Sequence, residues 1–232
     1  MKTGAIVFLD ILGFKGIWQH KPERDVLNLL LAIPGVVKKA YKEPPPESGW
    51  PTVGEPEVTL LSDTIIITCE SQYPQVLLLM CAIINAILLN LLSYRMLARG
   101  AIGWGRYTKE GPIFLGPAVD DVAMWYEAAN WVGVVTTPRT NYMIDRLENR
   151  KFHAHGKEVD PFVKYDVPLK SGKSAFLNVF NWPGLMQASY AEGTFRQNMT
   201  GVFSEQDSID HSVHEKYENT LRFIDHVVKP NV

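Results

Sequence analysis

The sequence has few cysteines and no marked excess of charge of either sign. Cys69 and Cys81 are the only cysteines among 232 residues, which is too few for a disulfide scaffold or a cysteine-built zinc site and is typical of a reducing compartment. Lysine and arginine number 23 against 25 aspartates and glutamates, so no strongly basic field exists to steer the protein onto nucleic acid. We therefore expect no nucleic-acid partner.

A secretory signal and a membrane anchor are also not expected. The apolar run Ala5–Leu9 is broken by Asp10 after five residues, which argues against a signal peptide. Val76–Leu92 is almost wholly apolar and close to the length that crosses a bilayer, but Asn85 and Asn90 interrupt it. We interpret it as a helix buried between a sheet and a partner subunit, with a membrane span as the alternative. This places the protein in the cytoplasm.

The hydrophobic pattern predicts an α+β sandwich. Its predicted elements are the strand Ala5–Leu9, the helix Arg24–Tyr41 kinked or split at Pro34, the hairpin Glu57–Leu61 with Thr64–Thr68, the long apolar helix, the strand Ala98–Tyr107, the helix Ala118–Asn130, the strand Val132–Val135, the helix Asn141–Leu147, the strand Phe176–Phe180 and the helix His214–Val228. This order favours helices packed on a mainly antiparallel sheet. The pattern weakens past Val167, so we expect a main domain over residues 1–167 and an extension over 168–232 packed on it.

Two acids stand at the ends of neighbouring predicted strands. Asp10 follows the first strand and Asp63 lies at the hairpin tip, 53 positions later. If the two tips converge, their carboxylates suit hard cations such as Mg²⁺ or Mn²⁺, and two such ions can stabilise the attacking and leaving oxygens of a phosphoryl displacement. The alternative is that each acid is an ordinary turn or capping residue.

The residues that follow Asp10 suit a phosphate. Gly13 lies at a predicted strand-to-helix turn, where free backbone N–H groups can face a triphosphate, and Lys15 is close in sequence. The alternative is a glycine that merely makes the turn.

Four motifs in this order resemble the catalytic domain of class III nucleotidyl cyclases, the adenylate and guanylate cyclase type. Phe8–Phe14 (FLDILGF) is similar to their metal-binding signature, and Ser62–Ile67 (SDTIII) to their second metal aspartate. Arg99–Gly103 (RGAIG) is similar to the strand after their long helix, and Gly116–Asp120 (GPAVD) to the start of a later active-site helix. The resemblance covers roughly residues 5–147.

The resemblance implies a ferredoxin-like palm fold and a homodimer with both active sites at the subunit interface. It implies that Asp10, the backbone carbonyl of Ile11 and Asp63 hold two divalent cations, Mn²⁺ or Mg²⁺. It places Gly13, Phe14 and Lys15 against the nucleoside triphosphate substrate, where the ribose 3′-hydroxyl attacks the α-phosphate and pyrophosphate departs.

One departure from the family concerns the base. Thr59 and Ile113 stand where adenylate cyclases carry a purine-reading lysine and acid, and neither reproduces the glutamate-centred pair of guanylate cyclases. A buried site that lacks the partner of a substrate's polar edge discriminates against that substrate. The sequence then resembles the bacterial pyrimidine cyclases of the Pycsar anti-phage defence systems, which make cyclic UMP or cyclic CMP for a separate effector. We favour UTP over CTP.

A second departure concerns the transition state. Asp120 and Met124 stand where the family has an active-site asparagine and a stabilising arginine. We take Arg99 as the candidate replacement, with Arg106, Lys15 or a residue of the other subunit as alternatives. A catalytically inactive cyclase-like domain is the competing hypothesis. The two aspartates favour activity, because neighbouring carboxylates repel each other without cations.

Overall fold

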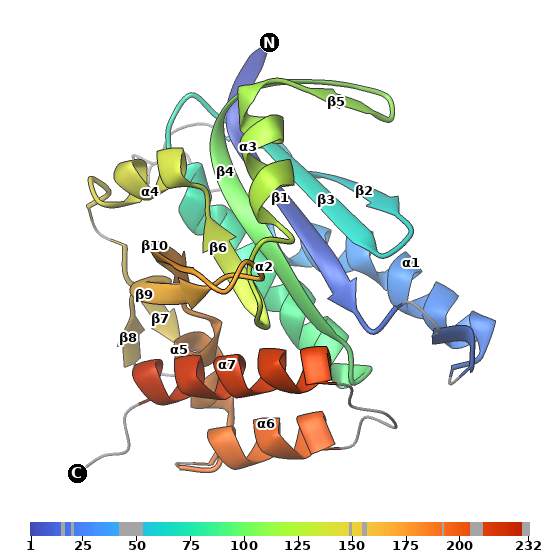
Figure 1. Cartoon of the computed structure of the whole chain (residues 1–232). Coiled ribbons are helices and arrows are strands. Elements are labelled where there is room, and N and C mark those ends of the chain that lie inside the picture. Colours follow the sequence, from blue (N-terminus) through green and yellow to red (C-terminus); the bar gives the residue numbers. More distant parts are fainter. Residues whose placement is uncertain are drawn as a thin grey trace.

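The sheet begins with a ferredoxin-like core in the computed structural model. The strands β1 (Lys2–Leu12), β2 (Glu57–Leu61), β3 (Thr64–Glu70) and β4 (Leu97–Glu110) lie in the order β2-β3-β1-β4 (Figure 1). Helix α1 (Glu23–Ala40) joins β1 to β2, and α2 (Val76–Ser93) joins β3 to β4. This is the β-α-β-β-α-β succession of ferredoxin-like folds. The predicted α+β class with a mainly antiparallel sheet is confirmed.

Beyond β4 the sheet continues into the last third of the chain. β6 (Gly133–Thr136) pairs parallel with β4, and β10 (Ser174–Phe180) pairs antiparallel with β6 and with β9 (Phe162–Pro168). β5 (Ile113–Leu115) pairs with the far end of β4. The predicted boundary after residue 167 falls inside β9, whose partner β10 follows it, so residues on both sides of the boundary share the eight-stranded sheet.

The structure describes residues 1–14, 17–19, 21–41, 53–148, 150–154, 157–191, 193–204 and 211–228. Its further elements are the 3-10 turns Ile17–Gln19 and Gln187–Ser189, α3 (Pro117–Trp125), α4 (Pro138–Ile144), the small hairpin of β7 (Phe152–Ala154) and β8 (Lys157–Val159), α5 (Trp182–Met186), α6 (Phe195–Ser204) and α7 (His211–Val227). α1 runs unbroken through Pro34, so the predicted split is wrong. Pro34 is exposed, and water can therefore satisfy the carbonyl that the proline leaves without a donor.

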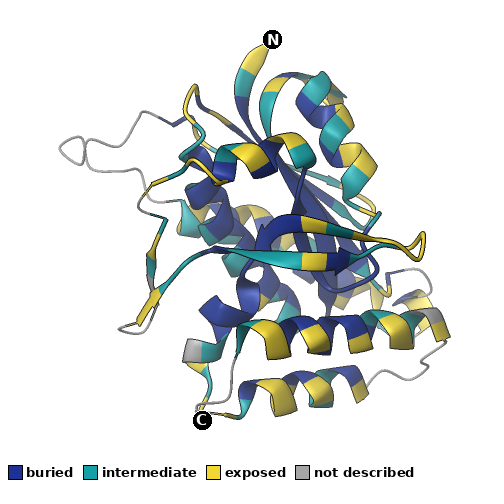
Figure 2. Ribbon diagram, turned by 60° about the vertical axis from the view of Figure 1, so that its left-hand side comes forward, coloured by how far each residue is buried: buried dark blue, intermediate teal, exposed yellow. Residues whose placement is uncertain are grey.

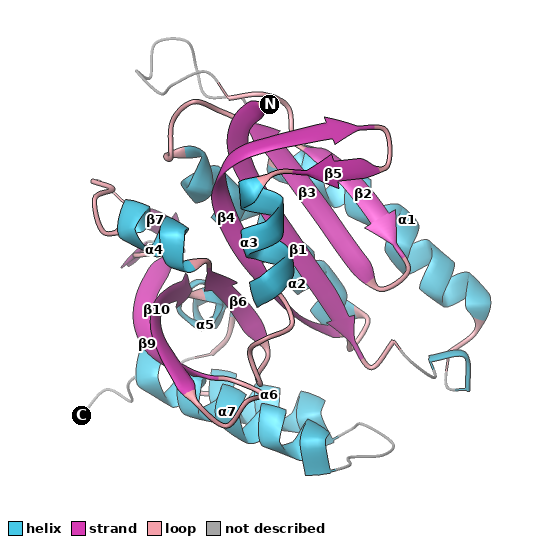
Figure 3. Ribbon diagram, turned by 45° about the horizontal axis from the view of Figure 1, so that its top comes forward, coloured by secondary structure: helices cyan, strands magenta, loops and turns pink. Residues whose placement is uncertain are grey.

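The central strands have two unlike faces. Directly paired residues of antiparallel strands point to the same side of a sheet. The covered face carries Val7, Leu9, Ile65 and Ile67, each 0% exposed, and packs against α2. Helix α1 lies beside α2 on the same face and contacts β2 (Figures 2 and 3). The site face carries the alternate positions, among them Asp10, and α3 lies over part of it (Figure 3).

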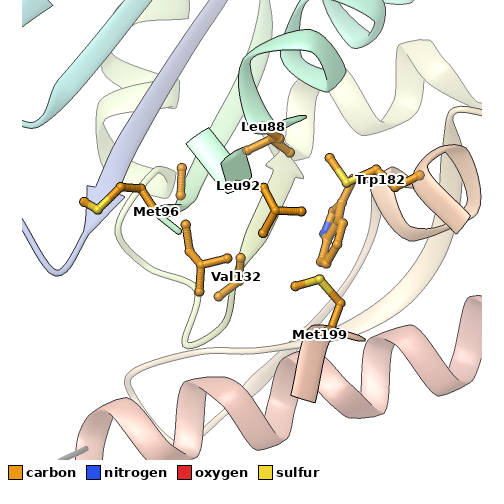
Figure 4. Close-up of a pocket in the computed structure, with 9 residues that line it drawn as sticks. Leu88, Leu92, Met96, Val132, Trp182 and Met199 are labelled. Atoms are coloured by element: carbon orange, nitrogen blue, oxygen red, sulfur yellow. The ribbon is translucent and has the colours of Figure 1, made fainter. Parts of the chain in front are cut away.

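Helix α2 is the one helix of the described residues that is long and apolar enough to cross a membrane, and 56% of that stretch is buried inside the protein. It packs against β1, β4, α1 and α5. Its end leaves a small apolar cavity of about 20 Å³ beside α5 and α6, lined by side chains that include Leu88, Leu92, Met96, Val132, Trp182 and Met199 (Figure 4). A void of this size and polarity holds no substrate and belongs to the core.

Candidate active site

The structure brings the two predicted metal acids to one edge of the sheet. The backbone N–H of Ile11 donates to the carbonyl oxygen of Asp63 at 2.9 Å, so the β2–β3 turn lies against the end of β1. Ser62 makes that turn with φ at +56°. Asp10 and Asp63 thus become neighbours across 53 positions of sequence. The role predicted for the Ile11 carbonyl stays a prediction.

Asp10 lies within β1 and not at its end, because an arginine on the next strand accommodates its charge. Asp10 is opposite Arg99 in the β1–β4 register, and both residues are buried, at 8% and 7% exposure. The Arg99 Nε and Nη2 atoms lie 3.0 and 2.9 Å from Asp10 Oδ2. Both contacts end on one carboxylate oxygen, Oδ2.

The electrostatics of Asp10 favour a further cation. Burial raises the pKa of Asp10, the Arg99 charge and hydrogen bond oppose that rise, and the carboxylates of Asp63 and Glu127 add to it. The net shift is upward, so one arginine does not offset the burial and the neighbouring negative charges. A divalent cation between these carboxylates would lower their mutual repulsion.

Arg99 also has a nitrogen without a partner. Within the described part of the chain, its Nη1 atom is buried and makes no hydrogen bond. A buried donor without an acceptor costs free energy, about 1–3 kcal/mol in typical cases and more for charged groups. An anionic oxygen bound beside Asp10 would satisfy it, as a phosphate oxygen does for arginine elsewhere.

Helix α3 delivers two residues that the sequence did not reveal. Gly103 on β4 allows the helix to approach closely, because a Cβ there would lie 2.6 Å from Val122. The end of α3 therefore reaches β1, where the Tyr126 ring packs edge-to-face on Phe8 with centroids 5.6 Å apart. Glu127 follows Tyr126 and acts electrostatically on Asp10. Burial first, and then Glu127, raise the pKa of Tyr126.

Lys170 is a further charged residue near Asp10, Arg99 and Glu127. Its Nζ lies 3.9 Å from Glu127 Oε2, and its backbone N–H donates to Ala128. It comes from the β9–β10 turn, in the part of the chain where the sequence pattern is weak. An exposed lysine beside Gly172 is ordinary turn chemistry, so no sequence signal marks it.

The residues present fit a hard cation. Aspartate oxygens suit Mg²⁺ or Mn²⁺, and Mg²⁺ sites commonly use only one or two carboxylates plus substrate phosphates. Among the described residues no cluster of three or more histidine, cysteine or acidic side chains is placed to hold a metal. Asp10 and Asp63, with the backbone carbonyl of Ile11, stay the predicted donor set for the two cations.

The predicted phosphate loop is described in part. Gly13 has φ at +76°, which a residue with a side chain rarely adopts, and it turns the chain at the end of β1. The Phe14 side chain is buried and packs edge-to-face against Trp18, with ring centroids 6.0 Å apart. Only the Phe14 backbone is thus available to a phosphate. Lys15 lies outside the described residues.

Thr59 lies on the site face. It pairs with Ile66, which pairs with Phe8, two residues before Asp10 on the same side of the sheet. A row of adjacent strands spaced about 4.8 Å apart puts Thr59 about 10 Å from the β1 backbone.

Ile113 and Asp120 do not meet Asp10 within one chain. Ile113 pairs with Glu110, eleven residues along β4 from Arg99, which at about 3.4 Å per residue is more than 30 Å in an extended strand. The exposed Asp120 lies in the first turn of α3, which begins beside Gly105, and so is about 20 Å from the Arg99 pair. The alternative candidate Arg106 is also on this distant part of β4, opposite Thr3.

The chain is similar in fold to solved nucleotide cyclase structures. One is the adenylyl cyclase CyaB from P. aeruginosa, with 13% identity, coverage of 77% of this chain and 92% of that chain, and a TM-score of 0.46. Another is an adenylate/guanylate cyclase/hydrolase from Silicibacter pomeroyi, with 16% identity, coverage of 77% of this chain and 95% of that chain, and a TM-score of 0.46. A third is the guanylate cyclase domain of RhGC from Catenaria anguillulae in complex with GTP, with 14% identity, coverage of 77% of this chain and 96% of that chain, and a TM-score of 0.43. No protein-family model and no curated protein sequence matches the chain. At these identities and TM-scores, likeness alone carries no conclusion about activity.

Proposed function

We propose that the protein is a metal-dependent nucleotidyl cyclase that converts UTP to 3′,5′-cyclic UMP and pyrophosphate. The observation that carries the proposal is the meeting of Asp10 and Asp63, reported by the 2.9 Å hydrogen bond from Ile11 to Asp63. In this reaction the ribose 3′-oxygen forms a bond to the α-phosphorus, and the bond from that phosphorus to the oxygen of the β-phosphate breaks.

Each residue of the site has a defined task in this proposal. Two bound divalent cations would lower the pKa of the 3′-hydroxyl and neutralise charge on the phosphates. Asp10 and Asp63 hold those cations, and the Gly13 and Phe14 backbone faces the triphosphate. Arg99 uses its unpartnered Nη1 to bind a phosphate oxygen while its other nitrogens keep Asp10 in position.

The pyrimidine preference rests on Thr59. This threonine lies on the site face where a purine-reading lysine would be needed, and its short hydroxyl side chain cannot replace a long cation. Ile113 and Asp120 would serve the site of the other subunit in a homodimer, because each lies too far from Asp10 in its own chain. In this proposal cyclic UMP signals to a separate effector protein in anti-phage defence, and the enzyme works in the cytoplasm.

A nucleotide panel tests the proposal. We expect purified protein with Mn²⁺ to convert UTP fastest, CTP more slowly, and ATP and GTP least, with products identified by mass spectrometry. Thr59→Lys provides a matched variant, because it restores the long cation and is expected to reduce the preference for UTP over ATP. Faster cyclisation of ATP or GTP than of both pyrimidines by the unaltered protein would contradict the pyrimidine assignment.

The second candidate function is a catalytically inactive nucleotide-binding domain. Two observations favour it: Met124 is 72% exposed where the family carries its transition-state arginine, and Arg99 is engaged by Asp10. This alternative predicts that UTP raises the melting temperature of the protein while no cyclic product forms with any nucleotide. Product formation that is lost in Asp63→Asn would exclude it.

A further inference from the structure

The outward face of α1 is apolar at its middle. The buried face of this helix packs mainly on α2, at the outer edge of the helical layer (Figure 1). Leu27 and Leu31 lie on the opposite side of the helix, one turn apart, and are 51% and 65% exposed. Single exposed leucines are common, but two in line at the centre of one helix face form an apolar stripe. The described part of the chain leaves this stripe uncovered.

Pro34 and Gly35 continue this exposed face towards the end of the helix. Both are among the least favourable residues in a helix interior. Packing within the chain does not require the glycine, because a Cβ at Gly35 would meet no heavy atom within 4 Å. A glycine on an exposed helix face instead leaves room for a second backbone to approach closely.

The charges at the two ends of α1 are opposite. Glu23 and Asp25 lie in its first turn, and Lys38 and Lys39 lie in its last turn. All four residues are exposed, and none of them forms an ion pair with another residue that the structure describes. With Arg24 counted, the first turn has two acids and one base, a net charge of −1, against +2 for the two lysines. Such a helix is complementary to an antiparallel copy of itself, because each acidic end then faces a basic end.

We propose that the outward face of α1 is a self-association surface, on which the α1 helix of a second copy of this chain lies antiparallel. A twofold axis beside Leu31, close to the middle of the helix, places Leu31 against its own copy. The same axis sets Leu27 against Pro34 of the second copy, since both lie on one side of the stripe at about 100° per residue. It also sets Glu23 near Lys38 of the second copy.

This surface differs from the homodimer interface that the family resemblance implies. That interface contains the active sites, and Asp10 lies on the site face of the sheet. Helix α1 lies on the covered side of the same sheet, beside α2. Two twofold interfaces on opposite sides of one chain join dimers into tetramers or filaments.

Sedimentation velocity of the full chain at about 1–100 µM tests the surface, a range that suits a small interface. We expect Leu31→Asp to halve the mass of the largest species, because it places a charge at the twofold axis. The matched control is Phe176→Asp, at a 67% exposed residue of β10, which should leave the mass unchanged. Thermal melting verifies that both variants are folded. An unaltered protein whose mass equals that of Leu31→Asp over the whole range would overturn the proposal.

Charge reversal tests the antiparallel arrangement. Glu23→Lys and Lys38→Glu should each weaken association about fivefold, because each sets like charges opposite one another at two symmetric places. The double variant Glu23→Lys with Lys38→Glu again sets an acid opposite a base across the axis and should recover the affinity of the unaltered protein. Single effects that add in the double variant would exclude the antiparallel pairing.

A cysteine at the axis gives an independent test. Leu31→Cys should form a disulfide between two copies under copper-phenanthroline oxidation, because the proposed axis brings the two side chains into contact. The natural Cys69 and Cys81 are both 0% exposed, so they contribute little background. Cross-linking of Leu31→Cys that is no faster than that of the control Phe176→Cys would contradict the pairing. These measurements are independent of nucleotide turnover, so the proposed function and this surface can fail separately.

Discussion

The two faces of the central strands differ in what they bury. The covered face buries Val7, Leu9, Ile65 and Ile67, which need only a matching helix surface. The site face, on the alternate residues of the same strands, buries the Asp10–Arg99 salt bridge beside apolar residues such as Phe8. Desolvating two charges costs several kcal/mol per ion before their attraction offsets it, so an ion pair is a poor substitute for apolar packing. The comparison teaches that the covered face is wholly apolar, whereas the site face keeps a charged pair that apolar packing alone would not require.

The largest expected effect is a loss of turnover when a predicted cation ligand on the site face is substituted. Asp63→Asn removes a cation ligand from a half-buried turn and changes no core packing. We expect cyclic UMP formation to fall by about 10³-fold, in the range of a lost electrostatic stabiliser, with the free energy of unfolding unchanged. Product mass spectrometry and urea titration measure the two quantities. Normal turnover in this variant would show that the site face does not carry the reaction.

The next largest expected effect is a loss of stability when the salt bridge of the site face is broken. Arg99→Met leaves Asp10 as a buried carboxylate without its partner, and we expect the free energy of unfolding at pH 7 to fall by about 3–5 kcal/mol. The double variant Asp10→Leu with Arg99→Met removes both charges and should recover most of that loss. If the single and double variants are equally unstable, packing and not the unpaired charge explains the effect.

The covered face gives the matched comparison. Leu9 is 0% exposed, and Leu9→Ala should lower the free energy of unfolding by about 3 kcal/mol through lost burial and a residual cavity. Turnover per folded molecule should stay within about twofold, because Leu9 points away from Asp10. Active-site titration of the folded fraction separates the two effects. A turnover loss as large as that of Asp63→Asn would remove the distinction between the faces.

The smallest expected effect is on pH dependence. The raised pKa of Asp10 means that its contribution to stability is present below about pH 3.9 and is lost as the pH rises through the raised pKa. Burial acts to raise the pKa of Asp145, but hydrogen bonds from Asn178 and Lys164 outweigh it and lower that pKa. The Asp145 contribution is therefore present above about pH 3.9 and is lost as the pH falls through the lowered pKa.

Asp10→Asn and Asp145→Asn should thus change the slope of the unfolding free energy against pH in opposite directions. Urea titrations between about pH 3 and pH 7 in metal-free buffer measure both slopes. Slope changes of the same sign would show that Asp10 is not held by burial in the way described.

The strongly patterned half of the fold was predictable from sequence. The hairpin at Ser62-Asp63, the apolar helix α2 and the glycine-containing strand β4 agree with prediction to within a few residues, because each has a single clear period or a turn signal. β1 extends past its predicted end at Leu9 to Leu12, since Arg99 accommodates the acid inside the sheet. β9, α5 and α6 were missed because their strand and helix patterns are short and mixed.

The site residues were predictable from sequence only where an apolar run ends in a turn. Asp10 and Asp63 follow apolar runs, so their convergence could be expected from the strand order alone. Glu127, Lys170 and Lys216 reach the same region through packing of α3, the β9–β10 turn and α7. No local spacing encodes such an approach, because it depends on how distant elements pack.

The place of β10 and β9 at the end of the sheet has a practical consequence for truncation or fusion. A chain cut after residue 167 would lose β10, and β6 would present an unpaired edge with the apolar Val134 and Val135 beside it. Unpaired apolar strands recruit copies of themselves and aggregate. A truncated protein that ends after residue 167 is therefore expected to aggregate, and reporter proteins are best fused outside residues 1–228.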